Sequence, residues 1–206
     1  MQIITHENGP FLVNTYLVLN ETSGKAFIID PGTDIEPLCK KIEKEKILLE
    51  ATVCTHGHLD HVFGVSALQK KYNIPFYMNK MDLHFIDSLP FQAGIFGVSD
   101  PGIPTLDFDL PTSGMISLAD IQINLLYTPG HSKGSVSIYI EESVFSGDAL
   151  FNFSIGRTDL PDGNYNELIT SVKEKLFSLP EETKVFPGHG PSTTIGRERE
   201  YNPFFD

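Results

Sequence analysis

The fold of this chain is decided by the stretch Thr55-His56-Gly57-His58-Leu59-Asp60-His61. Three imidazoles and one carboxylate fall within six positions, directly after an apolar run, residues 48–54, that is typical of a buried strand. Residues 62–72 carry a helical pattern, so the cluster is predicted on a turn between a strand and a helix, where side chains can converge. One helix face cannot collect four groups at this spacing. A tight loop can, and Gly57 is expected to supply unusual backbone dihedrals there.

Imidazole nitrogens and carboxylate oxygens are the ligands that divalent zinc and iron prefer in proteins. The alternative is a polar turn that contains histidines for no particular reason. Histidine is an uncommon residue, however, and three within six positions rarely occur without a ligand role. The stretch alone leaves open whether it binds one metal ion or two, and the remaining ligands must come from elsewhere in the chain.

Length and composition favour one ordinary globular domain, which we expect to span residues 1–206. Hydrophobic residues make up 40% of the chain and charged residues 20%, enough for one core without a second domain. The formal net charge of −12 disfavours binding to nucleic acid, which depends on neutralising phosphates. It also disfavours an anionic membrane surface.

Several features predict a cytoplasmic protein. The N-terminus lacks a basic segment followed by an apolar core, and no apolar run approaches the roughly 18 residues that span a bilayer. The two cysteines, Cys39 and Cys54, are expected on a helix and on a buried strand, which argues against a disulfide framework. We expect a monomer or a homodimer with a small-molecule partner.

The order of the elements follows from periodicity and turn residues. Strands are expected over residues 11–19, 26–30, 48–54, 75–78, 114–119, 121–127, 135–140, 143–147 and 184–186. Helices are expected over residues 35–46, 62–72, 79–88, 164–179 and 194–201. Asp34 is predicted as the N-cap of the first helix, because Pro37 then falls in the first turn, where its missing N–H costs nothing. Two similar halves with helices outside predict an α/β protein of four layers, αββα, with two mixed sheets packed face to face.

Residues 89–111 are expected to form a long connection rich in proline and glycine, with apolar side chains spaced along it. A loop of this length inside a compact domain is usually functional or mobile. Three interpretations are open: its aromatic residues pack down over the fold, it forms a lid or wall of a substrate pocket, or it makes a dimer contact. We predict a lid.

Three further ligand candidates, His131, Asp148 and His189, each follow a predicted strand and a glycine. A lone histidine is more often structural, and Gly-Asp is a common turn, but the recurrence at three strand ends indicates one set. Glycine before each candidate suits a close approach of the backbone to something. Seven ligands are too many for one tetrahedral ion but suit two metal ions, in which case one carboxylate bridges them.

The pattern His-x-His-x-Asp-His, followed by His, Asp and His at strand ends, resembles the metallo-β-lactamase fold superfamily over essentially the whole chain. The resemblance implies that His56, His58 and His131 hold one metal, that Asp60, His61 and His189 hold another, and that Asp148 bridges. It implies two divalent ions per chain, with zinc expected first and iron or manganese as alternatives.

Within that superfamily, the chain looks most like the glyoxalase II group. The similar strings are Thr128-Pro129-Gly130-His131, Gly147-Asp148, Leu150-Phe151, residues 154–160 and residues 186–190, and the tail, residues 193–198 with Asn202-Pro203, resembles that group's short single-domain members. The long enzymes of the group carry a C-terminal helical domain that contributes to glutathione binding, and we expect none here. Lys133 also stands where many members have proline or a small residue. Both departures concern glutathione, and neither touches the metal ligands.

The predicted function is metal-dependent hydrolysis of a thioester such as S-lactoylglutathione. Metal coordination lowers the pKa of water to roughly 7, so a metal-bridging hydroxide is available to attack the carbonyl. A thiolate, whose conjugate acid has a pKa of about 8.5, leaves with little protonation. An amine or an alkoxide needs a general acid, and the sequence offers only Asp60 as a possible proton shuttle.

Four more residues are assigned around the metals. The resemblance implies that Arg157 fixes the site by bonding a ligand carboxylate or a backbone carbonyl; the alternative is a solvated surface arginine. Lys133 is a candidate for binding a substrate carboxylate. Phe151 and Phe153 follow Asp148 closely enough to line an apolar wall.

Other functions are weighed against hydrolysis of a thioester. A persulfide dioxygenase of the same superfamily uses one iron held by two histidines and one aspartate, whereas all seven ligands are present here. A β-lactamase is disfavoured because Asp148 stands where those enzymes place cysteine or a non-ligand, and a tRNA-processing nuclease because of the negative charge. A lactonase or another ester hydrolase of this fold stays open, as does a binding protein that keeps a metal for stability.

Overall fold

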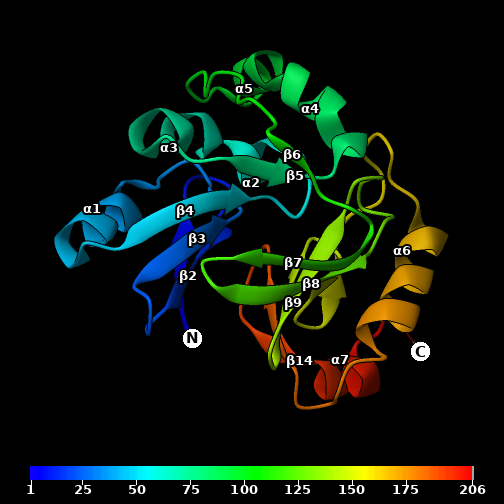
Figure 1. The fold of residues 1–206 in the computed structure, drawn as a ribbon. Coiled ribbons are helices and arrows are strands. Elements are labelled where there is room, and N and C mark those ends of the chain that lie inside the picture. The colour runs from blue at the N-terminus through cyan, green and yellow to red at the C-terminus, as the bar shows by residue number, and fades with distance from the viewer. Residues whose placement is uncertain (206) are drawn as a thin grey trace.

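Two six-stranded sheets form the centre of the computed structural model, which describes residues 1–205 (Figure 1). The first sheet contains, in spatial order, β1 (Gln2–Asn8), β2 (Val13–Asn20), β3 (Lys25–Ile29), β4 (Leu48–Val53), β5 (Phe76–Met78) and β6 (Phe108–Asp109). The second contains β14 (Thr193–Thr194), β13 (Lys184–Pro187), β10 (Ser143–Gly147), β9 (Val136–Ile140), β8 (Ile121–Tyr127) and β7 (Ser113–Leu118). A small hairpin pairs β11 (Leu150–Phe151) with β12 (Ser154–Ile155).

Helices cover the outer face of each sheet (Figure 1). On the side of the first sheet lie α1 (Glu36–Glu45), α2 (Leu59–Val62), α3 (Val65–Tyr72), η1 (Lys80–Asp82), α4 (Leu83–Asp87) and α5 (Leu89–Phe96). On the side of the second lie α6 (Tyr165–Ser171), its π-helical continuation η2 (Val172–Leu176) and α7 (Ile195–Tyr201). The predicted αββα arrangement of two mixed sheets between helices is confirmed. Within residues 1–205, no helix has the length and apolar character needed to cross a membrane.

Successive side chains of a strand point to opposite faces of the sheet and therefore pack in different layers. In β2, Tyr16 and Val18 join the core between the two sheets, whereas Leu17 and Leu19 pack under α1 and α3. The strand is buried on both faces and therefore reads as a continuous apolar run. Phe145 of β10 meets Tyr16 across the central core, with ring centroids 5.0 Å apart. Each such fully buried side chain contributes roughly 1.5–3 kcal/mol to folding.

Strand direction brings the loops that carry the ligand candidates to one edge of the molecule. β3, β4 and β5 are parallel, and so are β10 and β13. β8 runs in the same direction as β10, because each is antiparallel to β9. In open α/β sheets, sites form beyond the carboxyl ends of parallel strands. The two sheets are joined at this edge by a hydrogen bond of 2.9 Å from Val136 N–H to the Thr55 carbonyl.

Two details at the N-terminal end differ from the sequence-based predictions. β1 was not predicted, because it is an edge strand whose residues are mostly exposed or half-buried and mostly polar. The N-cap of α1 is Ile35, without a side-chain cap, so the prediction of Asp34 is wrong. Asp34 is instead tied to β1: its N–H donates to Asn8 Oδ1, and its carbonyl lies 2.8 Å from His6 Nε2. Pro37 does fall in the first turn.

The segment 89–111 is not the unstructured connection that its composition predicts. Residues 89–96 form α5, and residues 108–109 add β6 to the first sheet. Pro90 lies in the first turn of α5, where proline is tolerated, and the helix ends at Gly97 in the left-handed region. The Phe96 ring packs edge-on against Phe11, with centroids 5.3 Å apart.

Candidate metal centre

The seven predicted ligands lie together at the shared strand edge. Three overlapping sets have ligand atoms within 4.8 Å of one another: His56, His58 and His131; His56, His61 and Asp148; Asp60, His61 and His189. We call the first of these sets the first ligand group and the last the second ligand group. Each group combines residues of the segment 56–61, which follows β4, with a histidine from a loop of the second sheet, so both sheets must be in place before either group is complete.

The three imidazoles of the first ligand group face one another. His58 Nδ1 and His131 Nε2 are 2.8 Å apart. The His56 ring lies 4.8 Å, centroid to centroid, from each of the other two rings. Nitrogens this close on three converging rings can act together as ligands of one cation.

Asp148 is in reach of both groups. One carboxylate oxygen, Oδ1, lies 3.3 Å from His61 Nε2, and the other, Oδ2, lies 3.5 Å from His131 Nε2 and 3.6 Å from His189 Nε2. Asp60 Oδ2 lies 3.1 Å from His189 Nε2 and 3.7 Å from His61 Nε2. Asp148 is therefore placed as a carboxylate between two neighbouring sites rather than as a member of one.

Unsatisfied hydrogen-bonding groups also indicate that these donor atoms bind metal ions. Among the described residues, His56 Nε2, His61 Nε2 and Asp148 Oδ1 are buried without a hydrogen-bond partner. Each such orphaned group costs about 1–3 kcal/mol, so three at one point are expected only where another species satisfies them. Nitrogen and carboxylate oxygen donors are those that borderline divalent metals prefer.

The other ring nitrogen of four ligand histidines is fixed by a neighbour. The contacts are His56 Nδ1 with Thr55 Oγ1 at 3.1 Å, His61 Nδ1 with Asp30 Oδ2 at 3.0 Å, His131 Nδ1 with the Arg157 carbonyl at 2.8 Å, and His189 Nδ1 with the Leu12 carbonyl at 3.2 Å. Such contacts set ring orientation and tautomer in metal sites. His58 differs: its Nε2 is buried without a partner among residues 1–205, and the Phe85 ring lies 4.7 Å from its ring.

Asp30 was not predicted as part of the site. It is buried and accepts hydrogen bonds of 2.7 Å from both the N–H and the hydroxyl of Thr55, besides its contact with His61. One carboxylate thus holds the start of the ligand loop and orients one ligand. Its position directly after β3, before Pro31-Gly32, matches the strand-end placement of the ligands, and that signal could have found it.

Asp82 was also missed, and it ties the two ligand loops together. Its carboxylate accepts hydrogen bonds from Gly57 N–H at 2.9 Å, Ser132 Oγ at 2.6 Å and Gly134 N–H at 2.6 Å. Gly57 lies against it so closely that a Cβ there would stand 2.8 Å from the Asp82 Cβ. Close approach therefore explains Gly57, which has no positive φ, and the expectation of unusual dihedrals is wrong.

The loop that carries His189 is held by β2 from the other end of the chain. Asn14 Nδ2 donates to the carbonyls of Pro187 and Gly190, at 3.0 and 2.8 Å, and Tyr16 Oη donates to Pro187 at 2.5 Å. Gly188 leaves no room for a side chain, because a Cβ would overlap the Asp148 carboxylate. His189 is therefore positioned by backbone contacts on both sides.

Two predicted roles are corrected by the structure. The Arg157 guanidinium is exposed and makes two hydrogen bonds of 2.7 Å to Asp159, so its side chain does not reach a ligand; only its backbone carbonyl does. A bidentate pairing with a carboxylate two residues away outcompetes a more distant one. Phe153 does not line the metal centre either, because its ring lies under the Arg197 guanidinium of α7, 4.7 Å away.

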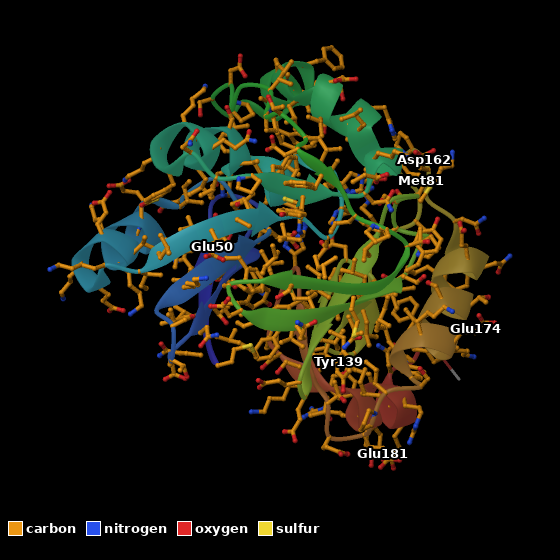
Figure 2. The ribbon with its side chains drawn as sticks, in the orientation of Figure 1. Glu50, Met81, Tyr139, Asp162, Glu174 and Glu181 are labelled. Carbon is orange, nitrogen blue, oxygen red and sulfur yellow. The ribbon has the colours of Figure 1, made fainter. Side chains whose placement is uncertain are left out.

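Phe151 and Lys133 contact different residues of the chain. The Phe151 ring is edge-on to His189, with centroids 6.0 Å apart, and its role as a wall of the site stays a prediction. Lys133 Nζ lies 2.7 Å from Asp162, which also pairs with His84 Nε2 at 3.0 Å. Figure 2 shows Asp162 beside Met81, where the loop before α6 meets η1. The Lys133 ammonium is thus already paired with a carboxylate.

Electrostatics separates His56 and His58 from His61 and His189. Burial lowers the pKa of His58 to about 3 and the pKa of His56 well below its ordinary value, with neighbouring imidazoles adding to both effects. For His61, burial acts in the same direction, but the Asp148, Asp60 and Asp30 carboxylates outweigh it and raise the pKa well above the ordinary value. The pKa of His189 is also raised: its hydrogen bond to Asp60 and the charge of Asp148 outweigh burial.

Acidification is therefore expected to remove metal from the second ligand group before the first. A histidine binds a metal only when it is neutral, and a raised pKa means that protons compete at higher pH. Metal content per chain, measured after dialysis at steps from about pH 8 to about pH 5, around the ordinary histidine pKa of about 6.5, should show two separate losses. His58→Ala should lose its remaining ion at higher pH than His189→Ala. Loss in the reverse order, or at one pH, would contradict the assignment.

Sequence and structure comparisons agree with this fold and cluster. Residues 8–189 match the family model of the metallo-β-lactamase superfamily, and the chain belongs to that superfamily. The hydroxyacylglutathione hydrolase GloC of Haemophilus influenzae is 36% identical over 95% of this chain and 94% of its own. The crystal structure of the BLEG-1 B3 metallo-β-lactamase has a TM-score of 0.90 and 36% identity over 99% of both chains. That of TTHA1623 in a di-iron-bound form has a TM-score of 0.88 and 36% identity, over 98% of this chain and 99% of that one.

Proposed function

We propose that this protein hydrolyses thioesters with the help of two divalent metal ions. The observation that carries the proposal is the position of Asp148, whose two oxygens face His61 on one side and His131 and His189 on the other. A carboxylate shared by two complete ligand groups supports two ions rather than one. The similarity to TTHA1623 in its di-iron form supports the same number, and we propose zinc or iron as the ions.

Each ligand has a defined task in the proposed reaction. His56, His58 and His131 would hold one ion and Asp60, His61 and His189 the other, with Asp148 between them. Bound ions of this kind lower the pKa of water to about 7 and polarise a carbonyl oxygen. The chain itself fixes the ligands: Asp30 and Thr55 orient His61 and His56, and Asp82 holds the two loops at a constant separation.

The protonation state of Asp60 favours a thioester over an amide. As a metal ligand, Asp60 would be ionised, because a carboxylate binds a metal in its deprotonated form. An ionised carboxylate accepts protons and does not supply one to a leaving group at neutral pH. A thiolate leaves without that proton, since its conjugate acid has a pKa of about 8.5.

Steady-state hydrolysis of S-lactoylglutathione tests the proposal, because a relative with 36% identity is named as a hydroxyacylglutathione hydrolase. We expect kcat/KM above about 10⁴ M⁻¹s⁻¹, loss of activity in a chelator, and recovery on adding zinc or iron. The control is the same protein analysed for metal before and after chelation. No turnover of any thioester by protein that carries two ions per chain would contradict thioester hydrolysis.

Hydrolysis of a β-lactam is the second candidate, favoured by the likeness to BLEG-1. The cleaved bond is an amide, so the leaving nitrogen needs a proton that the ionised Asp60 does not readily provide. A chromogenic cephalosporin assayed beside the thioester decides between them. A persulfide dioxygenase would instead contain one iron per chain and consume oxygen.

A further inference from the structure

Solvent reaches the metal centre over the second ligand group. The side chains of His56, His61 and His131 are buried, whereas His189 is 27% exposed, Asp60 is 19% exposed and His58 is half-buried. The exposed edge of His189 and Asp60 therefore gives a substrate carbonyl a route to the centre. The side chains that flank His189 are the ones that a bound substrate would touch.

The flank beside His189 is apolar. The Leu12 carbonyl lies 3.2 Å from His189 Nδ1, and the Leu12 side chain is 57% exposed. Phe151 lies edge-on to the same histidine. Phe11, the neighbour of Leu12, contacts the ring of Phe96, which is 58% exposed on α5. We call these four residues, Phe11, Leu12, Phe96 and Phe151, the apolar rim.

Leu12 has a conformation that leucine adopts at a cost. Its φ is +54°, in the left-handed region, where a bulky side chain is strained and where glycine or asparagine is tolerated. The turn after β1, closed by the hydrogen bond from Leu12 N–H to the Gly9 carbonyl, needs a left-handed residue here but not a leucine. An exposed, strained leucine beside a metal-ligand candidate indicates a functional contact.

Two cations that could hold an anionic group of a substrate, Lys133 and Arg157, already have carboxylate partners. Lys133 is paired with Asp162, and Arg157 with Asp159. An anionic group of a substrate would compete with Asp162 or Asp159 for these cations, at a small cost because surface ion pairs are weak, whereas an aliphatic portion needs only the apolar rim.

We propose that the apolar rim binds an aliphatic substituent next to the scissile thioester, with Leu12 as a residue that determines specificity. The inference rests on the thioester hydrolysis proposed above. The substituent lies on the acyl side or on the thiol side of the carbonyl; its chemistry is the same in both cases. The protein then prefers thioesters with an apolar chain over the short, polar lactoyl group on glutathione.

The test measures kcat/KM for two series of thioesters. One series lengthens the acyl chain on a constant thiol from two to eight carbons, and the other lengthens an alkyl thiol on a constant acetyl group. In the wild-type protein, kcat/KM should rise about threefold per methylene in one series over the first few carbons, as expected for methylene burial. Leu12→Asn and Leu12→Gly should reduce the ratio between the longest and shortest substrates about tenfold or more, and Leu12→Met should keep most of it.

Thermal stability separates a contact with substrate from a structural role. Leu12→Asn removes strain and an exposed apolar side chain, so its Tm should equal or exceed that of the wild type. Leu48→Asn is the matched control, because Leu48 is also 57% exposed and begins β4, at the opposite end of that strand from the ligand segment, and this change should leave the chain-length ratio unaltered.

Four results would overturn the inference. Equal kcat/KM across both series in the wild-type protein would do so while leaving thioester hydrolysis intact. An unchanged chain-length ratio in Leu12→Asn would also overturn the inference. A lower ratio in a Leu12→Asn protein whose Tm is well below that of the wild type would do the same, because the variant would then be structurally damaged. Failure to hydrolyse any thioester, S-lactoylglutathione included, would overturn the proposed function and this inference together.

Discussion

Replacing Asp148 with alanine is expected to lower kcat/KM for the best thioester by about 10³-fold or more, on the order of 4 kcal/mol of transition-state stabilisation. It should also leave at most one metal ion per chain. The reason is that Asp148 faces both ligand groups, so both lose a ligand when its carboxylate is removed. Metal analysis of the purified variant and steady-state kinetics with added zinc measure the two effects.

The control for Asp148 is Asp159→Ala, which removes an exposed carboxylate from the same region of the chain. That variant should keep two ions and nearly full activity. Asp148→Asn keeps the shape of the side chain but removes the charge, and it should retain more metal than the alanine variant. Two ions per chain and near wild-type kcat/KM in Asp148→Ala would show that this carboxylate does not bridge.

Replacing Asp82 with alanine is expected to reduce the free energy of unfolding by about 3–5 kcal/mol. Three donors, Gly57 N–H, Ser132 Oγ–H and Gly134 N–H, lose their shared acceptor in a buried place. Urea unfolding followed by circular dichroism measures the loss. Metal affinity should fall as well, because His58 and His131 lie on the two loops that Asp82 joins.

Two further variants keep this prediction testable if Asp82→Ala does not fold. Ser132→Ala removes one of the three donors and should cost about 1 kcal/mol. Asp87→Ala, at an exposed position of α4, should be within about 0.5 kcal/mol of the wild type. If Asp82→Ala reduced the free energy of unfolding no more than Asp87→Ala does, the role of Asp82 as a link between the two loops would be contradicted.

The layered fold and the gathering of the ligand candidates could be predicted because both follow from local patterns. Apolar strand runs and helical periodicity indicate which segments form the sheets and which form the helices that cover them. Polar residues directly after strands indicate the edge of a sheet where a site can form. His131, Asp148 and His189 are far apart in sequence, yet each marks a strand end pointing the same way. Their assignment to particular metals stays a prediction.

What the sequence did not reveal depends on contacts between distant segments. Asp82 lies in a short helical turn, and nothing nearby in the sequence marks it as the acceptor for two loops. Arg157 was assigned through its side chain, but Asp159 captures that side chain and leaves the backbone carbonyl to His131. Phe153 lies in the left-handed region, at φ +56°, within the turn between β11 and β12, and its ring packs against α7.

The contact between His189 and Leu12 joins residues that are 177 positions apart. The entropy of closing such a loop grows only slowly with its length, but pairing distant segments makes folding slow. The metal centre is therefore among the last parts of the molecule that can form, and neither half of the chain can assemble it alone. Catalytic activity in this architecture therefore requires complete folding. A chain whose two halves have not docked lacks the metal centre and with it the activity.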